Sequence, residues 1–134
     1  MKKIYILFIF ILSSNLQALN SQNIVLLAER GNPHAQYDLG LLYKNNKKDF
    51  RHAFIWMHKS ALKGYMPAQY EFALMFHYGL GVRQNSELAQ LWFTRAARRG
   101  DSRAKSILYR FYSGKKINYL AQKYHSKNFR IIRR

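Results

Sequence analysis

The stretch AERGNPHA, residues 28–35, contains a spacing of alanine and glycine that occurs three times in the chain. It returns as ALKGYMPA at residues 61–68 and as ARRGDSRA at residues 97–104. In each copy the glycine follows the first alanine by three residues and precedes the second alanine by four. Self-similarity at such a period is typical of stacked supersecondary units. We therefore expect function to lie on a surface of the stack rather than in a central cleft.

Each copy of this spacing predicts the junction between two helices. Gly31, Gly64 and Gly100 are suited to end a helix, and Pro33 and Pro67 are suited to begin the next one. Apolar residues then recur at intervals of three and four, as in an amphipathic helix. The predicted helices cover about residues 23–30, 33–43, 49–63, 67–78, 85–99 and 101–112, and a degenerate last helix covers residues 117–127.

The two complete repeats differ in the turn between their helices. Tyr43 and Ala53 are ten residues apart, whereas the equivalent Phe76 and Ala89 are thirteen residues apart. The second repeat contains the turn Gly79-Leu80-Gly81-Val82, which has no counterpart in the first repeat. A stacked array tolerates a deletion confined to a loop, so we expect the missing three residues to be missing from the turn.

The amino terminus resembles a secretory signal peptide. Lys2 and Lys3 precede an apolar run at residues 4–12, a polar stretch at residues 13–17 and the small residue Ala18. The run is too short for a membrane anchor, because a spanning helix needs about 20 apolar residues. We therefore expect a signal peptide at residues 1–18, cleavage after Ala18, and a periplasmic or secreted protein with an array at residues 19–114.

The chain is strongly basic, with 23 Lys and Arg residues against six acids and a formal net charge of +17. Such a charge favours an acidic protein partner, an anionic envelope polymer or a lipid surface. We expect no nucleic acid partner for an exported protein, and the absence of cysteine removes disulfides and thiolate metal sites. Residues 115–134 are expected to form a capping helix and a basic tail, in which the cations are Lys115, Lys116, Lys123, Lys127, Arg130, Arg133 and Arg134.

Residues 22–114 resemble the Sel-one-like repeat, a relative of the tetratricopeptide repeat. The resemblance rests on A-x-x-G-x-x-x-A, on Trp56 and Trp92 three residues after an alanine, and on the G-L-G-V turn. The first repeat departs from the pattern because it lacks that turn, and Ala73 and Tyr109 stand where the first repeat has Gly40. The resemblance implies an all-α fold, a right-handed α–α superhelix of antiparallel helix pairs whose first helices line a concave face. It also implies an adaptor or scaffold.

Catalytic groupings are not evident in the sequence. Of the six acids, Asp49, Glu87 and Asp101 are expected at helix starts, where they offset the dipole. The five histidines lack the spacing of metal ligands and are interpreted as surface residues. Some members of the resembled family handle beta-lactams, but those are rich in cysteine. We therefore expect no enzyme, no metal and no cofactor, with beta-lactam chemistry through Asp38 and Glu71 as a minor alternative.

The resemblance assigns binding to exposed positions on the first helix of each pair. These positions are His34, Tyr37, Asp38, Leu41, Lys44, Tyr70, Glu71, Leu74, His77, Arg103, Ile107 and Arg110. Aromatic and arginine side chains are effective interface anchors. The leading hypothesis is a monomeric envelope adaptor that binds a protein partner, with an immunity protein against an exported toxin as a special case. The alternative is a basic module for anionic polymers or lipids.

Overall fold

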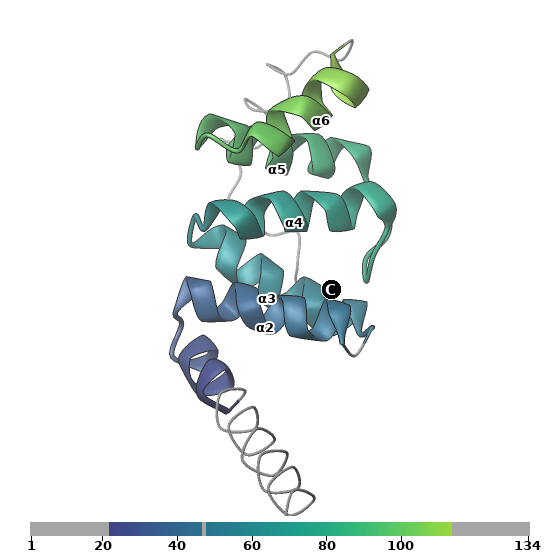
Figure 1. Ribbon diagram of the computed structural model, residues 1–134. Coiled ribbons are helices and arrows are strands. Elements are labelled where there is room, and N and C mark those ends of the chain that lie inside the picture. Colours follow the sequence, from purple (N-terminus) through teal and green to yellow (C-terminus); the bar gives the residue numbers. More distant parts are fainter. Residues whose placement is uncertain (1–21, 47, 114–134) are drawn as a thin grey trace, which may run out of the picture.

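The described part of the protein is a single stack of helices. The computed structural model describes residues 22–46 and 48–113, where helices are present and strands are not. A helical segment at residues 22–29 is followed by α2 (Pro33–Asn45), α3 (Phe50–Leu62), α4 (Met66–Tyr78), α5 (Ser86–Arg98) and α6 (Ser102–Tyr112). Each helix packs against the next in the chain, and Figure 1 shows them stacked in chain order. The prediction of an all-α solenoid is confirmed.

Two predicted parts of the chain lie outside the described residues. One is the signal peptide at residues 1–18, and the other is the capping helix and basic tail at residues 115–134. The predicted binding positions on the first helices, in contrast, all lie within the described residues. The structure thus describes the array itself and the surface that the resemblance assigned to binding.

The shortened turn is where the spacing predicted it. Helices α2, α3, α4 and α5 each contain 13 residues, so both repeats keep the full length of their helices. Residues 46–49 join α2 to α3, whereas residues 79–85 join α4 to α5. The longer turn contains Gly79 and Gly81, which have φ of 72° and 71°. The deletion therefore shortens a loop and leaves the helix register intact.

Side-chain caps explain most of the helix starts. Asn32, Asp49, Asn85 and Asp101 each accept a hydrogen bond from a backbone amide in the first turn of the following helix. Such a bond satisfies an amide that has no partner within the helix. Helix α4 is the exception, since its N-cap residue Tyr65 makes no capping bond. A large aromatic residue at a capping position indicates that Tyr65 has another role.

The core is larger in the second repeat than in the first. Trp92 is fully buried and meets Phe72 edge to face, with ring centroids 4.9 Å apart. The equivalent Trp56 is only half-buried, and it packs against a smaller cluster that includes Ala28 and Leu39. The ammonium of Lys59 lies 3.9 Å from the centroid of the Trp56 ring. Both tryptophans are thus packing residues, but Trp92 is fully buried and Trp56 is only half-buried.

Glutamine side chains tie together the first two of the three helix junctions, a feature that was not predicted from the sequence. Gln36 Nε2 donates to the carbonyl oxygen of Ala28 at 3.0 Å, and Gln69 Nε2 donates to that of Ala61 at 3.2 Å. Both glutamines are buried. A glutamine directly after the second alanine of the spacing could have predicted these bonds. It is present in the first two copies, whereas Lys105 follows Ala104 in the third.

The interpretation of the histidines as surface residues is wrong for His58. Its ring lies beside the rings of Phe54 and Phe72, with centroids 6.5 and 5.1 Å away. Its Nε2 atom is buried and has no hydrogen-bond partner within the described residues. Sequence periodicity did not separate this position from the surface, because histidine is tolerated on either side of a helix. Burial lowers the pKa of His58 below its ordinary value of 6.5.

His58 is expected to make the array less stable in mild acid. Its lowered pKa means that the unfolded chain binds a proton at a pH where the folded chain does not, so stability falls as pH drops below about 6.5. Urea unfolding at pH 7.5 and pH 5.0 measures this loss. His58→Leu should reduce the loss, and His34→Gln, at an exposed position, should retain it. An unchanged pH dependence in His58→Leu would contradict the assignment.

Candidate functional site

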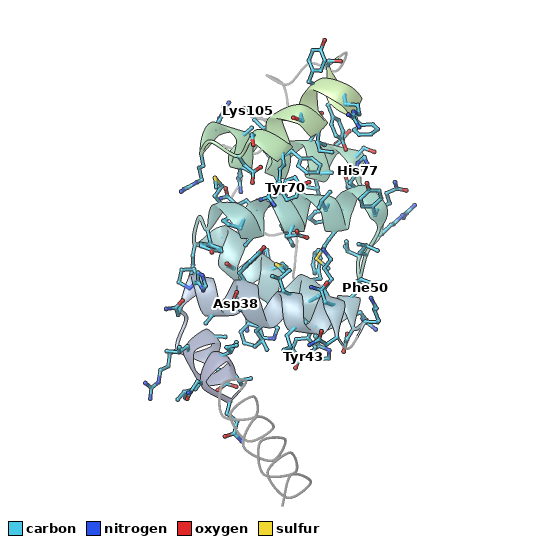
Figure 2. The ribbon with its side chains drawn as sticks, in the orientation of Figure 1. Asp38, Tyr43, Phe50, Tyr70, His77 and Lys105 are labelled. Carbon is cyan, nitrogen blue, oxygen red and sulfur yellow. The ribbon has the colours of Figure 1, made fainter. Side chains whose placement is uncertain are left out.

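The predicted binding positions lie on α2, α4 and α6, whose side chains together form what we call the first-helix face. Asp38 on α2 and Tyr70 and His77 on α4 are labelled in Figure 2, which shows the helices that carry them. Most of these positions are half-buried, with His34, Arg103 and Arg110 exposed. The face is therefore a partly packed surface rather than a row of freely solvated side chains.

An ion pair joins the first and second helix pairs across this face. Lys44 Nζ on α2 lies 2.7 Å from Glu71 Oε2 on α4, and the two side chains retain 25% and 14% of their exposure. Limited exposure reduces screening by water, so the attraction between these two charges is screened less than in a fully exposed salt bridge. Its geometry assigns Glu71 a structural partner. The paired-carboxylate alternative gains no support, because Asp38 bonds instead to His34 on its own helix.

Aromatic side chains gather beside this ion pair. The centroid of the Tyr65 ring lies 5.4 Å from that of His34 and 5.3 Å from that of Tyr37, both with edge-to-face geometry. Tyr65 was not among the predicted site residues. The signal that could have found it is its place in the frame, where the other two copies have the capping residues Asn32 and Asp101. A tyrosine there forgoes a cap and joins the first-helix face.

A second set of contacts joins α4 to α6. The guanidinium carbon of Arg103 lies 4.1 Å from the centroid of the Tyr70 ring, a cation–π arrangement. Arg103 Nη2 also lies 2.7 Å from Oδ2 of Asp101. Burial alone would raise the pKa of Asp101, but hydrogen bonds from Arg103 and from the Ala104 amide lower it. The carboxylate in turn raises the pKa of Arg103, and both groups are therefore charged near neutral pH.

Tyr37 and Tyr70 stay protonated near neutral pH. Burial raises the pKa of Tyr37, and the nearby Glu71 raises it further. Burial also raises the pKa of Tyr70. Their hydroxyl groups can therefore donate hydrogen bonds to a ligand. The positive charge of Arg103 on α6 offsets part of this rise for both tyrosines, although their pKa values remain above the ordinary value. Side chains from all three helices therefore influence the same tyrosines.

Some predicted positions do not join this cluster. Leu41, Leu74 and Ile107 pack against the core with part of their surface exposed. His77 Nδ1 lies 2.8 Å from the hydroxyl oxygen of Tyr112, and this contact ties α4 to α6. Arg110 lines a separate cavity with Lys105, Ser106 and Tyr109. The connected part of the face thus consists of His34, Tyr37, Asp38, Lys44, Tyr65, Tyr70, Glu71 and Arg103.

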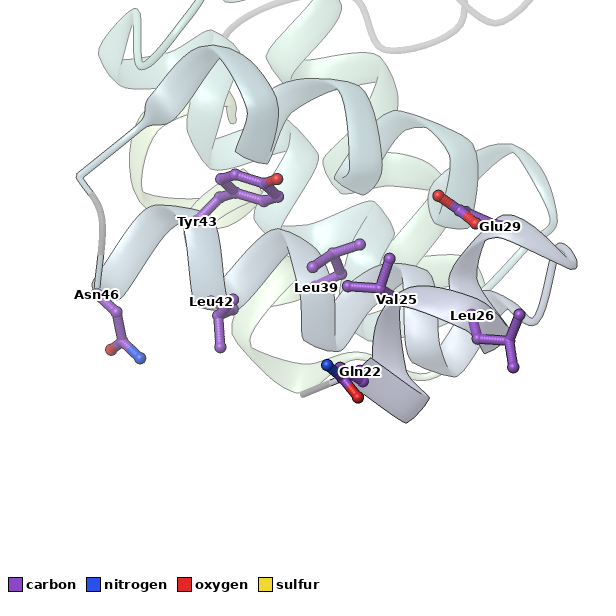
Figure 3. A pocket seen from close by; sticks show the side chains of 8 residues that line it. All are labelled: Gln22, Val25, Leu26, Glu29, Leu39, Leu42, Tyr43 and Asn46. Atoms are coloured by element: carbon purple, nitrogen blue, oxygen red, sulfur yellow. The ribbon is translucent and has the colours of Figure 1, made fainter. Parts of the chain in front are cut away.

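A cavity of about 550 Å³ lies at the start of the stack, between the helical segment 22–29 and α2. Figure 3 shows Val25 from the segment next to Leu39 of α2. Val25 and Leu26 are exposed, because among the described residues this end of the stack has no further helix beside it. Gln22, Glu29 and Asn46 also line the cavity, which is separate from the first-helix face.

The acidic side chains of the first-helix face already have partners within the array. No group of three or more histidine and acidic side chains in residues 22–46 and 48–113 could hold a metal ion. Within the same ranges, helices that are long and apolar enough to cross a membrane are not found. Every acid of the first-helix face has a cationic or histidine side chain within 3.0 Å. The face therefore presents aromatic rings and uncharged hydroxyl groups to a ligand, and its acidic side chains are already paired.

Comparison with known proteins decides the family. The family model of the Sel1 repeat matches residues 33–65 and 67–101. The chain belongs to the Sel1 repeat family. The matched residues contain α2 to α5, which are the two complete helix pairs, and they include the Gly64 junction between them. The resemblance of the sequence to the Sel-one-like repeat is confirmed.

Related proteins place this Sel1 repeat chain among helical solenoids. A Sel1 repeat protein from Oxalobacter formigenes is 34% identical, with 64% of this chain and 67% of that chain covered and a TM-score of 0.63. A protective antigen of uropathogenic Escherichia coli with an SLR fold is 32% identical, with coverage of 66% and 20% and a TM-score of 0.62. Chitin synthase regulatory factor 3 of Schizosaccharomyces pombe is 39% identical over 69 residues. The match covers 52% of this chain and 7% of that protein.

Proposed function

We propose that the chain is a non-enzymatic adaptor that holds a segment of a partner protein on the first-helix face. The observation that carries the proposal is the combination of half-buried aromatic side chains with charges paired inside the array. Lys44 is paired with Glu71, and Arg103 is paired with Asp101. Burying a charge without a counter-ion is costly. A partner that covers this face avoids that cost, because these charges already have counter-ions within the array. Membership of a repeat family that serves as a scaffold supports the same function.

The aromatic part of the face supplies the binding energy in this proposal. Tyr37, Tyr65 and Tyr70 are half-buried, so their rotamers are restricted before a partner arrives. Tyrosine is enriched among residues that dominate binding energy, in part because it offers a large contact area at a low entropic cost. The net charge of the chain, +17, adds long-range attraction to an acidic partner and raises the association rate.

Export of the chain is part of the proposal. It is supported by the order of residues 1–18, in which two lysines, an apolar run and a small residue follow one another. An exported array with an acidic partner fits an envelope adaptor, and it also fits an immunity protein that covers an exported toxin. Cell fractionation followed by amino-terminal sequencing of the purified chain tests export, since cleavage after Ala18 leaves Leu19 first.

A photocrosslinking residue at Tyr37 identifies the partner in the producing cell, and the same residue at the exposed Tyr78 provides the control. The affinity of the captured protein for purified variants then tests the face. Tyr70→Ala is expected to raise the dissociation constant by roughly 30-fold, the effect of losing a central aromatic anchor. Tyr70→Phe keeps the ring and its contact with Arg103, and it should bind within about threefold of the wild type.

Two results would contradict the use of this face. Equal crosslinking from positions 37 and 78 would show that capture does not depend on the first-helix face. A dissociation constant unchanged by Tyr70→Ala, in a variant that melts as a folded array, would show that the partner binds elsewhere. Tyr78→Ala is the matched substitution for the affinity measurement, because it removes the same side chain from an exposed position on the same helix.

A further inference from the structure

Arg103 is held in place on the first-helix face by contacts with two other residues. Its Nε and Nη2 atoms donate to Oδ1 and Oδ2 of Asp101 at 3.3 and 2.7 Å. Its guanidinium carbon lies 4.1 Å from the centroid of the Tyr70 ring. These contacts restrict the position of the guanidinium group before a partner arrives. A side chain that is already ordered loses less entropy when it binds a ligand.

Asp101 is a firm anchor for Arg103 because it is itself fixed. Asp101 is 4% exposed, and its Oδ1 atom also accepts hydrogen bonds from the backbone amides of Arg103 and Ala104 at 2.9 and 3.0 Å. The Arg103 side chain, in contrast, keeps 52% of its exposure. The start of α6 therefore fixes a carboxylate, and the carboxylate fixes a cation that is open to solvent.

Part of the guanidinium group of Arg103 is free to bind a ligand. An arginine side chain carries five N–H donors, of which Asp101 takes one from Nε and one from Nη2. The second hydrogen of Nη2 and those of Nη1 make no hydrogen bond among the described residues. One hydrogen of Nη1 and one of Nη2 lie side by side along the end of the group. We call this pair the free edge of Arg103.

The acids nearest to this edge on the first-helix face are engaged elsewhere. Oε2 of Glu71 lies 2.7 Å from Nζ of Lys44, and Oδ2 of Asp38 lies 3.0 Å from Nδ1 of His34. The hydroxyl group of Tyr37 makes no hydrogen bond among the described residues and adds a further donor. This part of the face therefore fits a ligand group that accepts hydrogen bonds and does not donate them.

We propose that the free edge of Arg103 binds an aspartate or glutamate side chain of the partner. The inference rests on the function proposed above and names the chemistry that the partner supplies. The two oxygens of a carboxylate match the paired donors of a guanidinium group, so the contact is bidentate. The net charge of +17 favours a second carboxylate near Asp101. Because the proposed segment also lies over Tyr37 and Tyr65, we assign a side chain within it rather than the end of its chain.

Two short peptides test this contact without the natural partner. They are acetyl-Gly-Glu-Gly-amide and its glutamine analogue, which have uncharged ends and differ only in the carboxylate. The full chain is titrated with each peptide at constant ionic strength, and the Nε–H signal of Arg103 is followed by nuclear magnetic resonance. The glutamate peptide should produce saturable shifts, and the glutamine peptide should bind at least about tenfold more weakly. Equal binding of the two peptides would overturn the proposal.

Arg103→Lys tests the free edge, because lysine keeps a positive charge beside Asp101 and lacks the planar pair of donors. This variant should prefer the glutamate peptide by less than about threefold. Arg103→Gln, in which Asp101 keeps its bonds to the backbone amides, should show no preference. Arg51→Gln removes a positive charge from an exposed position on α3 and should keep the full preference.

Urea unfolding checks that each of these variants is folded. A full preference in Arg103→Lys would show that a point charge is sufficient, and it would overturn the role of the free edge. An equal loss of preference in Arg51→Gln and Arg103→Gln would overturn the site, since it would reflect net charge alone.

The partner captured from position 37 separates this inference from the function on which it rests. One acidic side chain of the partner, changed to its amide, should show a non-additive loss of affinity with Arg103→Lys. Extension of the partner's carboxyl terminus by glycine should leave the dissociation constant unchanged, and a clear loss would overturn the assignment to a side chain. If Tyr70→Ala weakens the partner and both peptides bind equally, only the carboxylate contact is wrong. If the glutamate peptide is preferred and Tyr70→Ala has no effect, the partner binds elsewhere and the carboxylate site stands.

Discussion

Replacing Trp92 with alanine is expected to lower the free energy of unfolding by about 3–5 kcal/mol, the usual cost of removing a fully buried large aromatic side chain. Trp92 has no exposed surface and meets the ring of Phe72 at a centroid distance of 4.9 Å. The cavity left behind lies between α4 and α5, where neighbouring helices restrict collapse. Urea unfolding followed by helical circular dichroism measures the loss without depending on tryptophan fluorescence.

Trp56→Ala is the matched control for this prediction. Trp56 occupies the equivalent position in the first repeat, but its side chain is half-buried and packs on the smaller cluster of Ala28, Ala35 and Leu39. Less apolar surface returns to water when it is removed, so we expect a loss below about 2 kcal/mol. Equal losses in the two variants would show that the core does not strengthen from the first repeat to the second.

The contrast between the tryptophans shows the limit of sequence periodicity. The frame predicted that both residues pack at helix junctions, and both do. It did not predict that one would be fully buried and the other half-buried. Burial depends on how many helices lie beside a residue in the stack, and equivalent positions in a repeat share their local sequence but not their neighbours.

Local features of the fold were predicted well because each depends on a few adjacent residues. Asp49 and Asp101, which were expected at helix starts, cap helices because their short polar side chains reach a nearby amide. Gly31 and Gly64 end helical segments with φ of 90° and 84°, a conformation that other residues rarely adopt. The three-residue difference in the turns followed from simple counting, since both repeats keep 13-residue helices.

The candidate site was predicted in outline and not in its contacts. The resemblance placed Lys44, Glu71 and Arg103 on one side of the array, but their partners come from neighbouring helix pairs. Lys44 and Glu71 are 27 residues apart in the chain, and their separation in space depends on how the pairs stack. Tyr65 was not predicted because its contacts with Tyr37 and His34 come from a neighbouring helix pair.

Gly81→Ala is expected to destabilise the array by about 2–5 kcal/mol. The φ of Gly81 is 71°, and a residue with a Cβ atom pays about 1–2 kcal/mol in this region. The new methyl carbon would also lie 2.1 Å from the carbonyl oxygen of Phe50, at the first residue of α3. That neighbour is backbone and cannot rotate away, so the turn or the helix must shift, at a further cost of about 1–3 kcal/mol.

Gly100→Ala separates these two costs. Gly100 has φ of 103°, but a Cβ atom there would have no described atom within 4 Å, so its variant carries backbone strain alone and should lose about 1–2 kcal/mol. The difference between the variants in urea unfolding then measures the contact between Gly81 and Phe50. This contact joins the turn of the second repeat to a helix of the first, so it stabilises the stack and not only the turn. Equal losses would show that the turn moves freely and that the longer turn adds no stability between repeats.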